Sequence, residues 1–302
     1  MEEDRSTDEP SRLTSGHSSK NLRTATCQIL RIDGGDAELH GEVYVPTADS
    51  GSQPPYPGVL VCHGLTSDST ELRQAAATLS GRGLATMIFD FRGHGRSGGV
   101  CDRSQHLDVL DALRHLKRLP LVNGKRIGLV GHSSGARAAL LAASEADVAA
   151  VVSLSLAPDD IAQRMAGADS ALDLNKETLL GKTGAMARLL LSAVSGGPIR
   201  CLQLAALLVR LPHLRIDWTK TAAAWAEWKL TNALSVMKPR PMLFVHCKGD
   251  WATPAAASIE AYHACRGPKE LWLEPGGFHT TPLRSATLRE RWASWLCRQL
   301  YP

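Results

Sequence analysis

Three apolar runs that lack polar alternation constrain the fold of this chain more than any other feature. They are residues 58–63 (GVLVCH), 85–91 (ATMIFDF) and 126–131 (RIGLVG). Each run is followed by a segment with helical spacing of apolar residues, at 69–83, 104–119 and 134–146. Strands without alternation are buried on both faces, and strands separated by helices are typical of a parallel sheet. The sequence therefore predicts an α/β fold with a mostly parallel central sheet.

The same rhythm extends to both sides of these runs. Residues 24–32 and 39–46 read as two strands joined by the turn DGGD, which predicts a hairpin. A further strand is expected over residues 148–156. Near the C-terminus, strands and helices alternate again over residues 240–247, 253–265, 269–275 and 285–300.

Between residues 160 and 236 this alternation stops. The segment carries helical patterns over residues 184–194, 201–211 and 221–230 with no strand between them. A helical insertion between two halves of a sheet is most simply a cap over the edge of that sheet. We therefore expect an α/β core formed by residues 24–159 and 237–302, with a helical cap over residues 160–236. Residues 1–23 are polar and lack periodicity, which predicts a disordered tail.

Composition argues against several classes of protein. The chain has 302 residues and a net charge of +4, which is too small for its size to indicate a nucleic-acid partner. No apolar run approaches the ~20 residues that cross a bilayer, and the N-terminus lacks the apolar segment of a secretory signal. Seven scattered cysteines without a C-x-x-C pair suit a reducing compartment. A soluble, cytoplasmic protein is expected.

Basic residues are in excess within the expected cap. Six lie between Lys182 and Lys220, against one acidic residue, Asp217. Such an excess could attract an anionic substrate or bring the cap into peripheral contact with an acidic membrane surface. A solvated face is the more common explanation, and both interpretations stay open.

Two segments fit the G-x-S-x-G pattern that presents a nucleophilic serine. Ser97 lies in GRSGG and Ser133 in GHSSG. A nucleophile needs a tight turn between a strand and a helix, so that the helix N-terminus supports the developing negative charge. A helix follows Ser133 at once, whereas a loop follows Ser97. The first segment also fits G-x-G-x-x-G, but no helix opens within it to hold a pyrophosphate. We predict that Ser133 is the nucleophile and that Ser97 lies in a structural turn.

Ser133 requires a base, an orienting acid and donors for an oxyanion. Asp250 and His279 each follow a late strand, so they should reach the carboxyl edge of the sheet together with Ser133. The backbone amides of Ser134 and Leu65 are the expected oxyanion donors.

Other residues near these positions have alternative interpretations. Asp159 follows an earlier strand and is the reserve candidate for the acid. Three histidines in motif turns are expected to be supporting residues: His63, His94 and His132. Four tryptophans could line a substrate pocket, although plain packing explains the helical spacing of the first three equally well: Trp218, Trp225, Trp228 and Trp251.

With these residues in place, the chain resembles an α/β-hydrolase from about residue 24 to its end. The resemblance rests on four ordered motifs: HGLTSD, DFRGHGRSGG, GHSSGA, and the GD and H of the last two loops. The first two motifs are similar to those of cinnamoyl-esterase, dienelactone-hydrolase-like and monoacylglycerol-lipase-like groups. In many relatives the D-x-R-G-x-G-x-S turn is not catalytic. The serine departs from true dienelactone hydrolases, which use cysteine, and from haloalkane dehalogenases and epoxide hydrolases, which use aspartate.

The expected activity is hydrolysis of a carboxylic ester, a small-molecule acyl ester of open chain length, through an acyl-enzyme, with no metal and no organic cofactor. Thioester or amide hydrolysis and acyl transfer would use the same residues. A non-enzymatic ligand receptor on the same scaffold is a further alternative, because fold does not fix function. A nucleotide-dependent oxidoreductase is disfavoured by the missing helix after Gly93.

Overall fold

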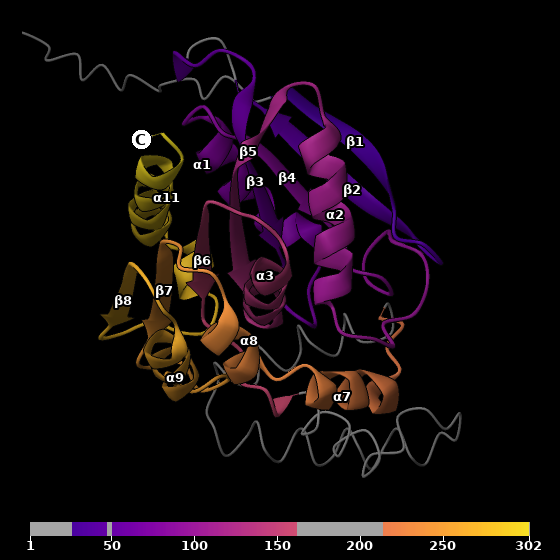
Figure 1. Ribbon diagram of the computed structural model, residues 1–302, viewed down its shortest axis with the longest axis vertical. Coiled ribbons are helices and arrows are strands. Elements are labelled where there is room, and N and C mark those ends of the chain that lie inside the picture. The colour runs from indigo at the N-terminus through magenta and orange to yellow at the C-terminus, as the bar shows by residue number, and fades with distance from the viewer. Residues whose placement is uncertain (1–25, 47–49, 162–213, 302) are drawn as a thin grey trace, which may run out of the picture.

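The computed structural model describes residues 26–46, 50–161 and 214–301. Within these residues an eight-stranded sheet has the order β1-β2-β4-β3-β5-β6-β7-β8 (Figure 1). The strands are β1 (Thr26–Asp33), β2 (Glu38–Val45), β3 (Tyr56–Cys62), β4 (Ala85–Phe89), β5 (Val122–His132), β6 (Ala150–Leu154), β7 (Met242–Cys247) and β8 (Lys269–Glu274). β1 pairs with β2, and β2 with β4, in antiparallel fashion; the other neighbours are parallel. The predicted hairpin and the mostly parallel sheet are both present.

Helices cover both faces of the sheet (Figure 1). They are α1 (Arg73–Ser80), α2 (His106–Arg118), α3 (Ser134–Glu145), α7 (Trp218–Glu227), α8 (Leu230–Val236), α9 (Ala256–Ala264), α10 (Thr281–Arg284) and α11 (Ala286–Leu300). One core cluster joins α1 and α11 to one face of the sheet through residues such as Leu79, Val152 and Trp292. The other joins α2, α3, α8 and α9 to the opposite face, for example through Leu140 and Phe244.

Two predicted helices have different bounds. The segment expected to be helical over 69–83 divides into a short 3₁₀ turn (Ser69–Leu72) and α1, and the Asp68 side chain accepts from the Thr70 amide at the start of that turn. The helix expected over 221–230 begins earlier, at Trp218, because the Asp217 side chain accepts from the Lys220 amide and caps it. That helix ends at Glu227, and α8 follows as a separate element.

The expected cap is only partly described. α7 and α8 fall within residues 160–236, and α8 packs in the core cluster with α2, α3 and α9. The helical patterns at 184–194 and 201–211 lie outside the described residues, as do residues 1–23 and four of the six basic residues between Lys182 and Lys220. Of the two basic residues that are described, Lys220 pairs with Asp217 at 3.4 Å and Arg215 Nε donates to the Gly99 carbonyl at 3.0 Å. Among the described helices, none combines the length and apolar character that spanning a bilayer requires.

Candidate active site

Ser133 lies on a tight turn between the end of β5 and the start of α3. Its backbone has φ 58° and ψ −121°, a conformation that costs a non-glycine residue on the order of 1–3 kcal/mol. A Cβ atom on Gly131 would lie 2.3 Å from the Gly135 carbonyl oxygen, and one on Gly135 would lie 2.3 Å from the His63 carbonyl oxygen. The Ser133 amide donates to the Leu154 carbonyl at 2.9 Å. This strained turn between a strand and a helix has the geometry that projects a serine hydroxyl.

Asp250 and His279 form a hydrogen-bonded pair in the loops after β7 and β8. His279 Nδ1 lies 2.8 Å from Asp250 Oδ2. Because a carboxylate only accepts, Nδ1 carries a proton, and in the neutral ring Nε2 is the nitrogen with the free lone pair. Burial alone would raise the pKa of Asp250, but hydrogen bonds from His246 and His279 hold that pKa well below its usual range. The contact and the ionised Asp250 are what a base paired with an orienting acid would require.

His132 joins the turn of Ser133 to the loop of His279. Its Nε2 donates to the His279 carbonyl at 3.0 Å, and the centroids of the two imidazole rings are 4.8 Å apart. Burial lowers the pKa of His132 to about 4, so its ring is neutral near pH 7. Within the described part of the chain the Ser133 hydroxyl makes no hydrogen bond, which leaves it available to a base or a substrate.

The two amides expected to form an oxyanion hole flank the serine. Ser134 is the first residue of α3, where backbone N–H groups have no partner within the helix. A Cβ atom on Gly64 would lie 3.3 Å from Ser133 Cβ, so the loop of Leu65 adjoins the serine turn. The Gly64 carbonyl accepts from His63 Nδ1 at 2.7 Å. Since the C=O and N–H of one trans peptide point in opposite directions, this bond turns the Leu65 N–H away from His63.

The protonation state of His63 follows from its partners. The Phe91 amide donates to His63 Nε2 at 3.1 Å, so the ring proton lies on Nδ1, toward Gly64. Burial lowers the pKa of His63 to about 4, with the neighbouring His94 as a smaller cause in the same direction. A neutral His63 therefore keeps the Gly64–Leu65 peptide in one orientation near pH 7.

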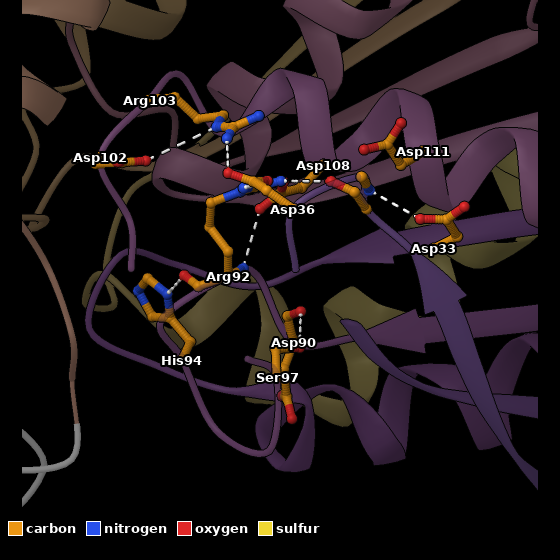
Figure 2. Close-up of polar contacts among 12 residues, drawn as sticks. Asp33, Asp36, Asp90, Arg92, His94, Ser97, Asp102, Arg103, Asp108 and Asp111 are labelled. Carbon is orange, nitrogen blue, oxygen red and sulfur yellow. Dashed lines mark hydrogen bonds and ion pairs between the residues drawn. The ribbon is translucent and has the colours of Figure 1, made fainter. Parts of the chain in front are cut away.

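The turn around Ser97 contacts the loop of Leu65 through His94. Figure 2 shows the side chains of Asp90, His94 and Ser97 in this turn. Ser97 is buried, and its hydroxyl donates to the Asp90 carbonyl at 2.5 Å while accepting from the His40 amide at 2.9 Å. His94 Nε2 lies 2.6 Å from the Leu65 carbonyl oxygen. No helix starts directly after the turn, because the next helix, α2, begins only at His106. The second serine is thus engaged on both sides of its hydroxyl and packed away from solvent.

Arg92, from the same turn, reaches in the other direction (Figure 2). It is buried, and its Nε donates to Asp108 Oδ1 at 2.7 Å while its Nη1 donates to Asp36 Oδ1 at 2.6 Å. Asp90 Oδ1 accepts from the Ser69 amide at 2.6 Å. The turn therefore ties the N-terminal hairpin, α2 and the segment after the Leu65 loop together.

A family model matches most of the chain. Residues 53–283 match the model of the hydrolase family Hydrolase_4, which is described as serine aminopeptidase, S33. The chain belongs to this family. It is an α/β-hydrolase, as the ordered motifs of the sequence suggest, and the mostly parallel sheet with helices on both faces is the fold of that superfamily.

Solved α/β-hydrolases and esterases have the same fold over nearly the whole chain. The α/β-hydrolase GrgF from Penicillium sp. sh18 is similar with a TM-score of 0.68 and 22% identity, covering 91% of this chain and 99% of that one. Est1E from Butyrivibrio proteoclasticus, solved with ferulic acid bound, has a TM-score of 0.64 and 20% identity, covering 90% and 100%. The Pyrococcus furiosus esterase Pf2001 has a TM-score of 0.61 and 20% identity, covering 96% and 99%.

Curated relatives are matched over a shorter stretch. An uncharacterized protein of Mycobacterium tuberculosis is 34% identical over 113 residues, which are 37% of this chain. The match spans only 39% of that relative's own length.

Sequence reasoning missed two side chains that contact Asp250, the candidate acid. His246, buried in β7, lies with its Nε2 3.3 Å from Asp250 Oδ2 and 3.0 Å from the Thr253 carbonyl oxygen. Thr253 Oγ1 lies 3.0 Å from Asp250 Oδ2, and the Ala252 and Thr253 amides donate to Asp250 Oδ1 at 2.9 and 3.0 Å. The spacing D-x-x-T could have indicated Thr253, because an aspartate commonly accepts from amides two and three residues later.

Asp159, the reserve acid, lies in a different network. Its Oδ1 accepts from Arg137 Nε at 2.8 Å, and its carboxylate also accepts from the Leu230 amide at 3.1 Å. Arg137 is buried in α3, and its guanidinium stacks 4.3 Å from the ring of Trp225. Asp159 therefore joins α3 to the segment of α7 and α8, whereas the carboxylate bonded to His279 is that of Asp250.

The four tryptophans occupy different surroundings. Trp225 is buried over Arg137, and the Trp228 ring packs 4.5 Å from that of His106. Trp218 is buried in a small cluster with Leu65, next to the expected oxyanion amide. Trp251 follows Asp250 and is 45% exposed. Only the last of these and Trp218 adjoin residues of the candidate site, and the pocket stays a prediction.

Proposed function

We propose that this α/β-hydrolase cleaves carboxylic esters through an acyl-enzyme formed on Ser133. The observation that carries the proposal is a strained serine turn connected through His132 to the hydrogen-bonded pair of Asp250 and His279. A serine hydroxyl is a weak nucleophile until a neighbouring base removes its proton. His279 of the pair is the proposed base. Because its Nδ1 proton is bonded to Asp250, Nε2 is the nitrogen that can accept the serine proton.

Each residue has a distinct role in the proposed reaction. His279 Nε2 takes the proton of Ser133 Oγ as that oxygen bonds to the ester carbonyl carbon, and the Leu65 and Ser134 amides donate to the resulting oxyanion. The bond to the alcohol oxygen then breaks, and the alcohol leaves with the proton from His279. A water molecule, deprotonated by His279, attacks the acyl carbon, which releases the acid and restores the serine.

The charges around His279 favour this cycle. Asp250 carries a negative charge because hydrogen bonds hold its pKa low, and it stabilises the imidazolium that forms in each step. His132 stays neutral because burial lowers its pKa to about 4, so it adds no like charge beside that imidazolium. Substrate binding beside Trp218 and Trp251 is part of the proposal, and the acyl or aryl group would lie against these rings.

The second candidate is cleavage of an aminoacyl amide bond. It is favoured by the description of the matched family as a serine aminopeptidase, and it uses the same residues with an amine as leaving group. Thioester hydrolysis and acyl transfer to an alcohol would use the same residues, whereas a receptor without activity would turn over neither the esters nor the anilides of the experiment below.

Turnover of matched substrates tests the proposal. We expect hydrolysis of p-nitrophenyl esters of graded acyl length, slower turnover of aminoacyl p-nitroanilides, and an acyl adduct on the intact protein in a mass spectrum of the quenched reaction. Ser133→Ala should abolish both turnover and adduct. Ser153→Ala is a matched control, because Ser153 is a buried serine of β6 whose hydroxyl has no hydrogen-bond partner among the described residues. Faster turnover of the anilides, or ester turnover that persists in Ser133→Ala, would contradict the proposal.

A further inference from the structure

Two described residues other than glycine have a positive φ, and both lie at the candidate site. One is Ser133, at 58°; the other is Ser155, at 49°, in the loop after β6. A left-handed backbone disfavours residues with a side chain, and such strain persists only where surrounding contacts fix it. Ser133 is strained because its turn projects the hydroxyl. Ser155 has no such role in the proposed reaction, so its strain needs another explanation.

The Ser155 side chain holds the backbone of the base. Its Oγ donates to the His279 carbonyl at 2.7 Å, and His132 Nε2 donates to the same oxygen at 3.0 Å. Ser155 is fully buried, so no water competes for this bond. The carbonyl oxygen of His279 thus accepts two hydrogen bonds, one from Ser155 after β6 and one from His132, the residue before Ser133.

Contacts on both sides of Ser155 fix its unusual backbone. Its amide donates to the Val245 carbonyl in β7 at 2.9 Å, and Thr253 Oγ1 lies 3.4 Å from its carbonyl oxygen. The same threonine hydroxyl contacts Asp250 Oδ2 at 3.0 Å and His279 Nδ1 at 3.1 Å. Ser155 therefore connects the strand that carries Asp250 with the loop that carries His279.

We propose that Ser155 is a positioning residue. It fixes the backbone of His279 and thereby the position of the imidazole relative to the Ser133 hydroxyl. The inference rests on the proposed function, since it assigns His279 as the base. Asp250 fixes the rotation and tautomer of the imidazole, while Ser155 and His132 fix the backbone from which the ring extends. Because Asp250 and His279 come from loops after different strands, a ring held only at Nδ1 could pivot away from Ser133. Displacements of about 1 Å at a reacting group cost about 10²-fold in rate.

Two substitutions separate this role from a role in stability. Ser155→Ala and Ser155→Gly both remove the hydroxyl, but only glycine relieves the left-handed strain. We expect the two variants to lose kcat on p-nitrophenyl acetate equally, by about tenfold to 10²-fold, with KM within about twofold of the wild type. The rate of inactivation by a fluorophosphonate should fall in parallel. The melting temperature should be higher for Ser155→Gly than for Ser155→Ala.

The results that overturn the inference are distinct from failure of the proposed function. If kcat follows the melting temperature, so that Ser155→Gly is clearly more active than Ser155→Ala, the residue is only structural. A kcat for Ser155→Gly within about twofold of the wild type, or a change confined to KM, also overturns it. If the wild-type protein itself does not react with the fluorophosphonate, the proposed function fails and the inference fails with it.

Discussion

Ser97 and Ser133 occupy the same five-residue pattern, yet their surroundings differ in every respect that matters for chemistry. Ser97 has an ordinary backbone and a buried hydroxyl bonded to the Asp90 carbonyl and the His40 amide. Ser133 has a strained backbone and a hydroxyl without a partner among the described residues. A helix starts at once after Ser133 and not after Ser97.

This difference indicates what a serine turn needs, beyond its sequence pattern, in order to react. Glycines on either side only allow the chain to turn sharply. Reactivity requires in addition that the hydroxyl have no other partner and that unpaired amides of a helix N-terminus lie beside it. Each prediction below is a way to break or sharpen the comparison between these two turns.

The largest expected effect separates the two serines directly. Ser133→Ala should lower kcat by about 10⁴-fold or more, because no nucleophile remains. Ser97→Ala should keep kcat within about tenfold but lower the free energy of unfolding by about 1–3 kcal/mol, because it leaves buried backbone groups unpaired. Steady-state kinetics and urea denaturation check both. An Ser97→Ala variant of normal stability that is as inactive as Ser133→Ala would reverse the assignment.

A second comparison concerns the two candidate acids. Asp250→Asn should lower kcat by about 10⁴-fold, because the amide no longer holds the productive tautomer of His279. Asp159→Asn should change kcat by less than about tenfold, while destabilising the fold on the order of 3 kcal/mol, because the buried guanidinium of Arg137 loses its counter-charge. Rates and denaturation curves of the two variants check this. A larger loss of kcat in Asp159→Asn would make that residue the acid.

The turn of Ser97 should also affect catalysis indirectly, through His94. His94→Phe removes the contact with the Leu65 carbonyl and should lower kcat/KM by about tenfold, since one oxyanion donor is worth about 10²- to 10³-fold and the change only loosens it. The affinity for a trifluoromethyl ketone, which forms an oxyanion on the serine, should weaken by the same factor. Unchanged ketone affinity would show that the turn does not support the amide of Leu65.

The smallest expected effect is on stability at acid pH. Burial lowers the pKa of His63 from 6.5 to about 4, so the unfolded chain binds a proton at this residue more readily than the folded chain. Its contribution to stability is present above pH 6.5 and is lost as the pH falls toward 4. We expect His63 to account for about 2 kcal/mol of the loss between about pH 7 and 4.5. Urea denaturation at several pH values should show that the free energy of unfolding depends less steeply on pH in His63→Gln than in the wild type. An equally steep dependence on pH would contradict the assignment.

Much of the fold could be predicted because local sequence and tertiary structure agree. The run GVLVCH, apart from its last residue, lies in β3, because an unbroken apolar run is typical of a strand buried on both faces. The alanine-rich segment after Ser133 forms α3, because its apolar residues have helical spacing. Asp250 and His279 could be placed because both follow strands whose carboxyl ends meet at one edge.

The parts that could not be predicted depend on contacts between distant segments. Nothing local to Ser155 encodes a positive φ, which is imposed by Val245 and Thr253. Asp159 could be interpreted as the acid that orients the base because it follows a strand, but its carboxylate accepts a hydrogen bond from the buried Arg137 on α3. A helix was expected to start at residue 221, and the cap formed by Asp217 moves its start to Trp218.

The most direct test of the account is the site of covalent labelling. The full-length protein should be treated with a fluorophosphonate at neutral pH, digested and mapped by mass spectrometry. The account predicts one adduct, on Ser133, with none on Ser97, and no adduct in the Asp250→Asn variant within the same reaction time. Labelling of Ser97, or a wild-type protein that turns over esters while Ser133 stays unmodified, would contradict it.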